Sequence, residues 1–159
     1  MPLVFRSMLA DGTGLRPRVA NDAESLGVRV SEETGGPKDV TVVDSKVQLG
    51  REGMSVSPSI LLLPSHRLPK RFKGLIPELV GRKVPSGKND LTCWKMGEGA
   101  FEDGGFAPGL LFLTQPIGSP KHGVISPEAE VPLQVYRIAL ANTQPDWTAI
   151  PWPWEGGRT

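Results

Sequence analysis

The stretch GMSVSPS (residues 53–59) places two serines in a short segment with the alternating pattern of a β-strand. Side chains two positions apart lie on the same face of a strand, so Ser55 and Ser57 are expected to share one face. Pro58 has no backbone N–H and limits how a central strand could continue. The stretch therefore predicts a short strand that presents two hydroxyls on one face and ends near Pro58.

Turn-forming residues divide the rest of the chain into many short elements. The 159 residues include 19 glycines and 16 prolines, and both residue types interrupt long helices. A chain of this length fits one compact domain with one core, and we predict a single domain over residues 1–159. Apolar, β-branched and aromatic runs predict further strands at residues 3–9, 25–30, 39–49, 91–96, 110–115 and 122–126.

One helix is predicted, at residues 132–143. Pro132 suits the first helical turn, where its missing N–H is not needed. The helical spacing predicts a broad apolar stripe, made of Leu133, Val135, Tyr136, Ile138 and Leu140. The apolar run 60–64 is predicted to be a short buried segment of undecided type, and the glycine-rich stretch 97–109 is predicted to be a loop.

The C-terminal stretch 145–159 carries three of the four tryptophans, Trp147, Trp152 and Trp154. Its prolines exclude a helix. We predict an extended strap whose indoles cover one face of the domain. An aromatic motif that binds a partner is the alternative.

The net charge of +1 hides an uneven distribution. Residues 54–88 hold seven lysines and arginines against one glutamate, whereas residues 89–159 hold four against eight acidic residues. The run HRLPKRFK (66–73) supplies most of the positive charge. It is either a solvated loop or a surface that binds phosphate or nucleic acid. Phe72 is its one aromatic residue, so phosphate binding is favoured over base recognition.

Composition also disfavours several kinds of site. Cys93 is the single cysteine, which excludes an intrachain disulfide and favours a buried structural thiol. Two histidines without nearby cysteines predict no metal site. No apolar stretch is long enough to span a membrane. The N-terminus lacks the features of a signal peptide, which predicts cytoplasmic synthesis without Sec-type export.

Polar residues occupy three predicted strands. Arg6 lies within the first strand, Ser55 in the serine strand, and His122 at the start of a late strand. Each has an ordinary explanation: an ion pair on the sheet, a half-buried hydroxyl, or a histidine at the end of a loop. Together they predict a sheet with one polar face, and such a face favours a binding site.

At these residues the chain resembles the ADP-ribosyltransferases. Members of that family often carry an aromatic residue and then Arg or His on the first strand, followed later by a strand of small hydroxyl residues. The order of motifs looks more narrowly like the small toxins of the type VI secretion class. The segments that carry the resemblance are Phe5–Arg6, Gly53–Val56 and His122–Pro127, with the predicted helix after them.

The resemblance implies an α+β fold in which two small antiparallel sheets, with few short helices, form a central cleft that holds NAD. It implies that Arg6, Ser55 and His122 are catalytic, and that Phe5, Arg6, Ser55, Ser57 and His122 bind the cofactor. Arg6 would contact the pyrophosphate or a ribose. Ser55 would bind the ribose on the nicotinamide side. It further implies a toxin that a dedicated secretion system delivers into a target cell, with an immunity or antitoxin partner.

One feature of the family has no clear counterpart. Many such transferases use a glutamate just before a late strand, whereas the one Glu-x-Glu spacing here is Glu128–Glu130, after the late strand. Acidic residues in that place favour a helix N-terminus. Three functions stay open: an ADP-ribosyltransferase, a non-enzymatic binding domain that uses 66–73 or the tryptophan tail, and an NAD hydrolase or phosphate-transferring relative.

Overall fold

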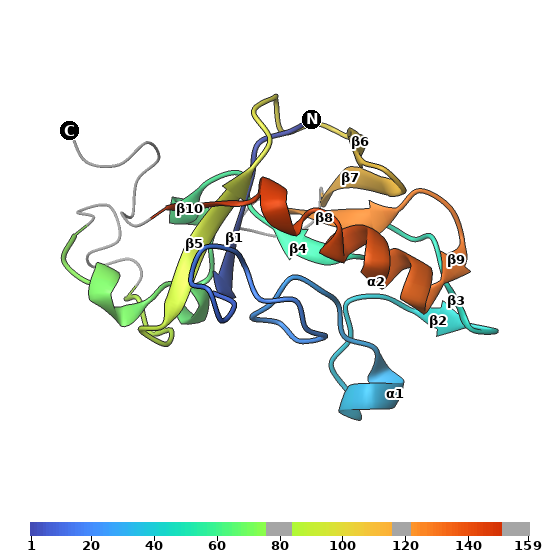
Figure 1. Ribbon diagram of the computed structural model, residues 1–159, viewed down its shortest axis with the longest axis horizontal. Coiled ribbons are helices and arrows are strands. Elements are labelled where there is room, and N and C mark those ends of the chain that lie inside the picture. The colour runs from blue at the N-terminus through green and yellow to red at the C-terminus, as the bar shows by residue number, and fades with distance from the viewer. Residues whose placement is uncertain (76–83, 116–121, 151–159) are drawn as a thin grey trace.

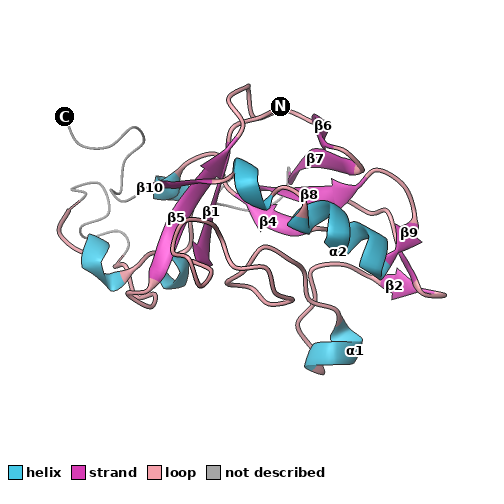
Figure 2. Cartoon of the chain, viewed as in Figure 1, coloured by secondary structure: helices cyan, strands magenta, loops and turns pink. Residues whose placement is uncertain are grey.

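A computed structural model describes residues 1–75, 84–115 and 122–150. The described chain is mixed α+β, built from small antiparallel sheets with two α-helices (Figures 1 and 2). Its strands are β1 (Val4–Leu9), β2 (Val42–Val43), β3 (Lys46–Val47), β4 (Met54–Val56), β5 (Leu91–Met96), β6 (Gly104–Ala107), β7 (Leu110–Gln115), β8 (His122–Pro127), β9 (Val131–Pro132) and β10 (Thr148–Ile150). Its helices are α1 (Ser31–Thr34) and α2 (Leu133–Ala141), with the 3₁₀ helices η1 (Ile60–Leu62), η2 (Ser65–Arg67), η3 (Lys70–Phe72) and η5 (Gln144–Asp146).

Two sheets are joined by one pair of backbone hydrogen bonds. The first has the strand order β1-β5-β10 and the second β4-β8-β7-β6, with antiparallel pairing in both. Phe5 of β1 and Ser57 exchange N–H···O bonds of 2.8 Å in each direction. A small third sheet has the order β2-β3-β9. The serine stretch therefore pairs with β8 through β4 and meets β1 just beyond it.

The strands predicted at 3–9, 91–96, 110–115 and 122–126 are confirmed as β1, β5, β7 and β8. The serine stretch is confirmed as the short strand β4. The expected fold class is confirmed at the level of small antiparallel sheets with few helices.

The prediction of a strand at residues 25–30 is wrong. Within this stretch the one β-bridge joins Leu26 to Val19 in parallel. Arginine side chains take backbone carbonyls that a neighbouring strand would otherwise bind: Arg6 donates to Ser25, and Arg137 donates to Val28. The segment is buried yet irregular, because side chains rather than a ladder satisfy those two carbonyls.

Residues 39–49 form a hairpin rather than one strand. β2 and β3 pair around a two-residue turn, Asp44 and Ser45, whose φ angles are 52° and 66°. Positive φ at both central residues matches the twist of a tight hairpin.

Two apolar segments are more exposed than predicted, since Leu61 in the run 60–64 and part of α2 face solvent. The run 60–64 begins with the 3₁₀ helix η1, where Ser59 accepts a hydrogen bond from the N–H of Leu61 at 3.2 Å. In α2, Tyr136 and Leu140 are buried, but Val135 and Ile138 are about half exposed. The buried apolar stripe is narrower than predicted, because only the side of this short helix that carries Tyr136 and Leu140 packs against the rest of the protein.

The tail is described only to Ile150. Trp147 is buried, and its indole N–H donates to Thr143 at 3.0 Å. The strand β10 then pairs with β5. The remainder of the predicted strap, with Trp152 and Trp154, lies outside the described residues, as do residues 76–83 and 116–121 of the predicted turn regions.

Strand β1 separates two clusters of buried side chains. Val4 and Met8 belong to the larger cluster, and Phe5 belongs to the smaller one. This division follows the two-residue alternation of a strand. Arg6 shares the face of Val4 and Met8, so a charged side chain points toward the larger cluster. In Figure 1 helix α2 crosses in front of the second sheet.

Candidate functional site

A pocket of about 370 Å³ opens where β1 and β4 separate beyond the Phe5–Ser57 bridge. Three of its walls contain residues named from the sequence: Arg6 from β1, Ser55 and Ser57 from the serine stretch, and His122 from β8. Other residues complete it. They include Ser7, Arg29 and Asp39, which the sequence did not single out, and His66 and Arg67 from the basic run 66–73.

Arg6 is buried and bound by backbone carbonyls. Its Nη1 donates to Ser55 at 2.7 Å, and its Nη2 donates to Ser25 at 3.0 Å and Ala23 at 3.3 Å. No ion pair joins Arg6 to an acidic residue in the described part of the chain. Burial lowers the pKa of this guanidinium to about 10, so it stays protonated at neutral pH. Arg6 thus places an unpaired positive charge in the pocket wall and also holds β4 against the 23–25 loop.

Ser7 follows Arg6 on an open edge of β1. The backbone N–H groups of Phe5 and Leu9 bond Ser57 and Glu24, on the side away from β5. Strand alternation directs the N–H and C=O of Ser7 to that same side. There no described residue bonds the Ser7 backbone. Its buried Oγ also has no hydrogen-bond partner in the described structure. Ser7 therefore presents a free donor and a free acceptor beside the pocket.

The two serines of the opening stretch have different surroundings. The carbonyl of Ser55 accepts from Arg6, while its Oγ makes no hydrogen bond to any described residue. Ser57 is buried, and its Oγ donates to the carbonyl of Ser59 at 2.8 Å. Ser55 has a hydroxyl available for a ligand, whereas that of Ser57 closes a local turn.

The other two predicted residues lie on different sides of this region. His122 is the first residue of β8, opposite Gln115, and lines the pocket. Phe5 is fully buried with Cys93 and Ile150 in the smaller cluster and does not line the pocket. Cys93 is confirmed as a buried thiol, and burial raises its pKa to about 12.

The charged residues around the pocket leave it positive. Arg29 binds Asp39 through two side-chain bonds of 3.0 and 3.1 Å, and the backbone N–H of Arg29 adds a third at 2.7 Å. Asp39 is the one carboxylate among the described lining residues, and Arg29 neutralises it. Arg6 and Arg67 remain without an acidic partner in the described structure. The charge of Arg67 contributes, after burial, to lowering the pKa of both Arg6 and His66.

The pair Glu128–Glu130 lies away from the pocket. His122 begins β8, whereas Glu128 follows its last residue, Pro127. Six strand residues span about 20 Å. All residues from 128 to 130 are exposed. The carboxylate that does line the pocket is Asp39, from a loop that sequence reasoning did not connect with the site.

Sequence reasoning also missed Ser7 and Arg29, whereas His66 and Arg67 belong to the run 66–73 that it named as a candidate phosphate-binding surface. Ser7 could have been found only from its place beside Arg6 in the predicted strand, because its open backbone edge depends on how the strands pair. Arg29 and Asp39 carried no signal in the sequence, because their pairing depends on how the 29–39 loop folds back.

Neither a metal cluster nor a membrane-spanning helix occurs in the described residues. No group of three or more His, Cys, Asp or Glu side chains in these ranges is arranged to hold a metal ion. None of the described helices has the length and apolar character needed to cross a bilayer. Comparisons of this chain with protein-family models, with curated proteins and with solved structures found no match.

Proposed function

We propose that this protein is a toxin-like, NAD-dependent ADP-ribosyltransferase that modifies an intracellular target. One observation carries the proposal: Arg6, Ser55 and His122, which the resemblance names as catalytic, come from three different strands and line one pocket. Chance similarity in short motifs gives no reason for such residues to meet. The two-sheet architecture is compatible with the cleft that this family uses.

The electrostatics of the pocket suit a dinucleotide. NAD carries a negative pyrophosphate, and Arg6 and Arg67 supply positive charge without acidic partners in the described structure. Charge-assisted hydrogen bonds from guanidinium to phosphate are among the stronger polar contacts in proteins. Buried or enclosed cations of like sign repel one another, and a bound anion would relieve that repulsion.

The open edge of β1 suits the other end of the cofactor. The nicotinamide carboxamide has one N–H₂ donor and one carbonyl acceptor. Ser7 offers a free backbone C=O and N–H on the side that faces away from β5. A carboxamide paired with these groups would sit next to Arg6 and Ser55. This would direct the glycosidic bond toward the hydroxyl of Ser55.

The proposed reaction breaks the bond between nicotinamide nitrogen and ribose C1′. The electron pair of that bond leaves with nicotinamide, which becomes neutral. A nucleophilic atom of the acceptor forms a new bond to C1′ and gives its proton to solvent. Positioning and electrostatics do most of this work. Ser55 would orient the ribose, and His122 would contact ribose or phosphate.

The biological setting follows from the same proposal. A toxin of this class would be delivered by a dedicated secretion system, and the producing cell would hold an immunity protein against it. Expression of the wild-type chain in a bacterial host is then expected to be toxic. Ser55→Ala is expected to relieve that toxicity.

Thermal stabilisation by NAD tests the proposal directly. At 100 times its dissociation constant, a ligand stabilises the native state by about 2.7 kcal/mol. For a chain of this size the melting temperature should rise by roughly 5–10 °C. Ser55→Ala should reduce the shift, whereas the exposed serine variant Ser86→Ala should keep it. An unchanged melting temperature of the wild-type protein, with no release of nicotinamide, would contradict the proposal.

A label in the ADP-ribose moiety of NAD separates transfer from hydrolysis, because hydrolysis yields only free ADP-ribose.

Ser7→Ala tests whether the buried hydroxyl of Ser7 lacks a hydrogen-bond partner. The Oγ of Ser7 is buried without a partner, and such a group costs about 1–3 kcal/mol. We expect the free energy of unfolding of the ligand-free variant to stay unchanged or to rise by up to about 1 kcal/mol. The control is Ser126→Ala, which removes a buried hydroxyl that donates to the carbonyl of Glu52. That control should lose about 1–2 kcal/mol in urea unfolding. Equal losses in both variants would show that the Ser7 hydroxyl has a partner.

A further inference from the structure

The basic run 66–73 belongs to a segment that is fastened to the first sheet. The segment 60–72, which includes the 3₁₀ helices η1, η2 and η3, places four apolar side chains in one cluster with Phe5, Cys93 and Ile150 of that sheet. The anchoring residues are Ile60, Leu63, Leu68 and Phe72, and all of them are buried. The backbone is tied as well, since the N–H of Lys70 bonds the carbonyl of Gly87 at 3.1 Å. The cations between the anchors are therefore presented on a supported surface.

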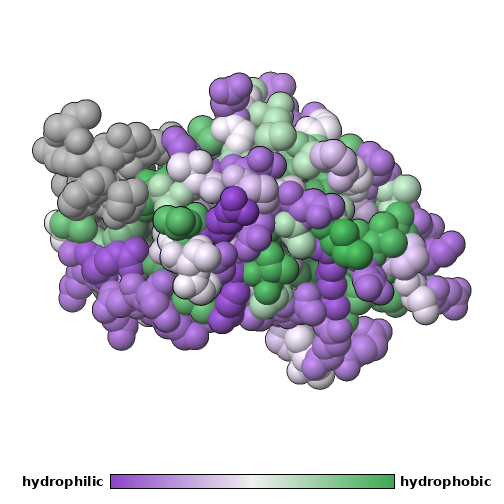
Figure 3. Space-filling view, viewed as in Figure 1, coloured by the Kyte–Doolittle hydropathy of each residue, from purple (hydrophilic) through white to green (hydrophobic). Residues whose placement is uncertain are grey.

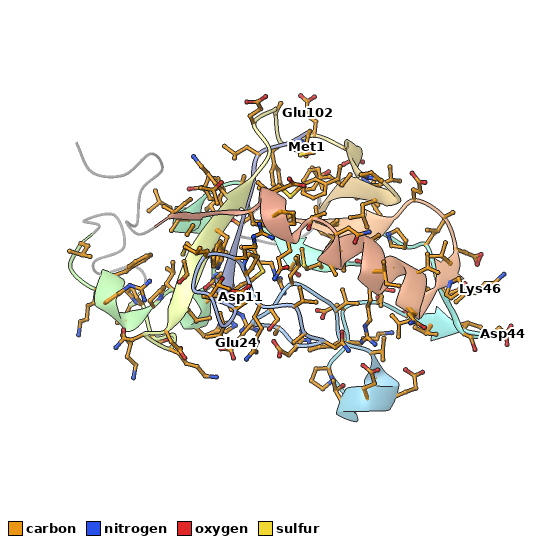
Figure 4. The ribbon with its side chains drawn as sticks, viewed as in Figure 1. Met1, Asp11, Glu24, Asp44, Lys46 and Glu102 are labelled. Atoms are coloured by element: carbon orange, nitrogen blue, oxygen red, sulfur yellow. The ribbon has the colours of Figure 1, made fainter. Side chains whose placement is uncertain are left out.

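This surface carries charge of one sign. Between residues 54 and 75 the chain has four lysines and arginines and no acidic residue. Lys70 and Lys73 are exposed, and neither pairs with an acidic residue of the described chain. The contrast is Lys88, which binds Glu24, the residue labelled in Figure 4, at 2.9 Å. Hydrophilic residues gather in Figure 3 over the part of the molecule where Figure 1 draws this green segment.

Two arginines of this surface have identifiable neighbours. Arg67 lines the pocket itself. Arg71 donates to the backbone carbonyl of Asn89, and its guanidinium lies 5.2 Å from the centre of the Phe72 ring. Positive charge therefore occurs both in the pocket wall, at Arg67, and on the neighbouring helix η3.

We propose that Arg67, Lys70, Arg71 and Lys73, here called the basic ridge, bind the sugar–phosphate backbone of a nucleic acid and lead that strand to the pocket. Phosphates fit better than an acidic protein. Protein interfaces have an apolar centre, yet no large apolar side chain is exposed between residues 62 and 74. Phe72 is buried and offers no face for base stacking, so the binding is expected to be independent of sequence.

The ridge has a consequence for the acceptor. The binding of a nucleic acid is inferred from the charges of the ridge alone. The role of that nucleic acid as acceptor of ADP-ribose rests on the proposed transferase function. In that role a nucleophilic nitrogen or oxygen of the nucleic acid bonds to C1′ of the ribose. The glycosidic electron pair departs with nicotinamide, and the proton of the nucleophile passes to solvent.

Fluorescence anisotropy with a labelled 20-nucleotide polythymidine strand tests the docking. The full chain should bind it at 50 mM salt and release it as salt rises. Binding frees counterions from the phosphates, and that release becomes less favourable at higher salt. In the double variant Lys70→Gln/Lys73→Gln, affinity should fall by about tenfold and the salt slope by about 1.4, from roughly 0.7 per lost cation. Arg67 is left unchanged, since it belongs to the pocket.

The matched control removes the same charge from two lysines outside the basic ridge. Lys38→Gln/Lys46→Gln changes two lysines near β2 and β3, and Figure 4 labels Lys46 there, far from the green segment. Its affinity for the strand should stay within about twofold of wild type. Equal losses of affinity in the two double variants would contradict the proposed role of the ridge, because net charge alone would then explain binding. Absence of binding at 50 mM salt, or tighter binding of polyglutamate than of the strand, would also overturn it.

Two further measurements separate this inference from the proposed function. The NAD-induced rise in melting temperature should be the same in wild type and Lys70→Gln/Lys73→Gln. Label from NAD should appear on the strand with wild type and fall with the double variant. Strand binding without any NAD shift would refute the transferase and leave the docking surface standing. An NAD shift without strand binding would refute the docking surface alone.

Discussion

Replacing Arg6 with glutamine is expected to lower the free energy of unfolding by about 3–5 kcal/mol. The guanidinium binds three backbone carbonyls, those of Ala23, Ser25 and Ser55, and the residue is only 8 % exposed. Glutamine has a shorter, uncharged side chain with only two N–H donors, so it leaves at least one of the three carbonyls without a partner. Each unsatisfied buried group costs about 1–3 kcal/mol. Urea unfolding followed by tryptophan fluorescence measures the loss.

A surface arginine provides the control for this change. Arg16 is exposed and makes no side-chain hydrogen bond to the described residues. Arg16→Gln should stay within about 0.5 kcal/mol of wild type. Arg6→Lys should lie between the two, because it keeps the charge but loses the fork of donors. If Arg6→Gln were as stable as Arg16→Gln, the carbonyl clamp would have no energetic role.

Gly53→Ala is expected to destabilise the protein by about 2–3 kcal/mol and to disturb the pocket as well. A Cβ at this position would stand 2.2 Å from the carbonyl oxygen of Ile125, on the neighbouring strand β8. That contact is with backbone, so a side-chain rotation cannot relieve it. The strand β4 would have to move away from β8, and Ser55 would move with it.

Tyr136 increases the expected cost at Gly53. Its hydroxyl accepts from the N–H of Met54 at 3.2 Å and donates to the carbonyl of Ile125. The new Cβ would also lie 3.1 Å from that hydroxyl. Displacement of β4 therefore strains a buried hydrogen-bond pair as well as the strand ladder.

Another glycine offers a matched control. Gly36 has no atom near its ideal Cβ position and no positive φ, so Gly36→Ala should keep wild-type stability or gain slightly. In Gly53→Ala, both the free energy of unfolding and the NAD-induced melting shift should fall. In Gly36→Ala, neither should fall. Wild-type values in Gly53→Ala would mean that β4 and β8 tolerate separation.

The strands that were predicted well share one property. β5 and β7 coincide with the predicted segments, and β1 and β8 differ from theirs by one residue at an end. Their β-branched, aromatic and aliphatic residues are bounded by glycine, proline or polar residues, and such a local pattern survives in the folded chain. Residues 25–30 carry a similar pattern but form no strand. Their carbonyls bind Arg6 and Arg137, which no local window of sequence contains.

The sequence by itself determined the short strands, the serine stretch and the concentration of positive charge in the middle of the chain. These are local properties, set by side-chain alternation, turn residues and composition. Only the tertiary structure decided which polar residues meet. The Phe5–Ser57 bridge brings β1 beside β4, Arg6 reaches the loop at Ser25, and Asp39 folds back to Arg29. Those contacts depend on long-range packing, because the burial of apolar residues elsewhere in the chain brings the two residues of each contact together.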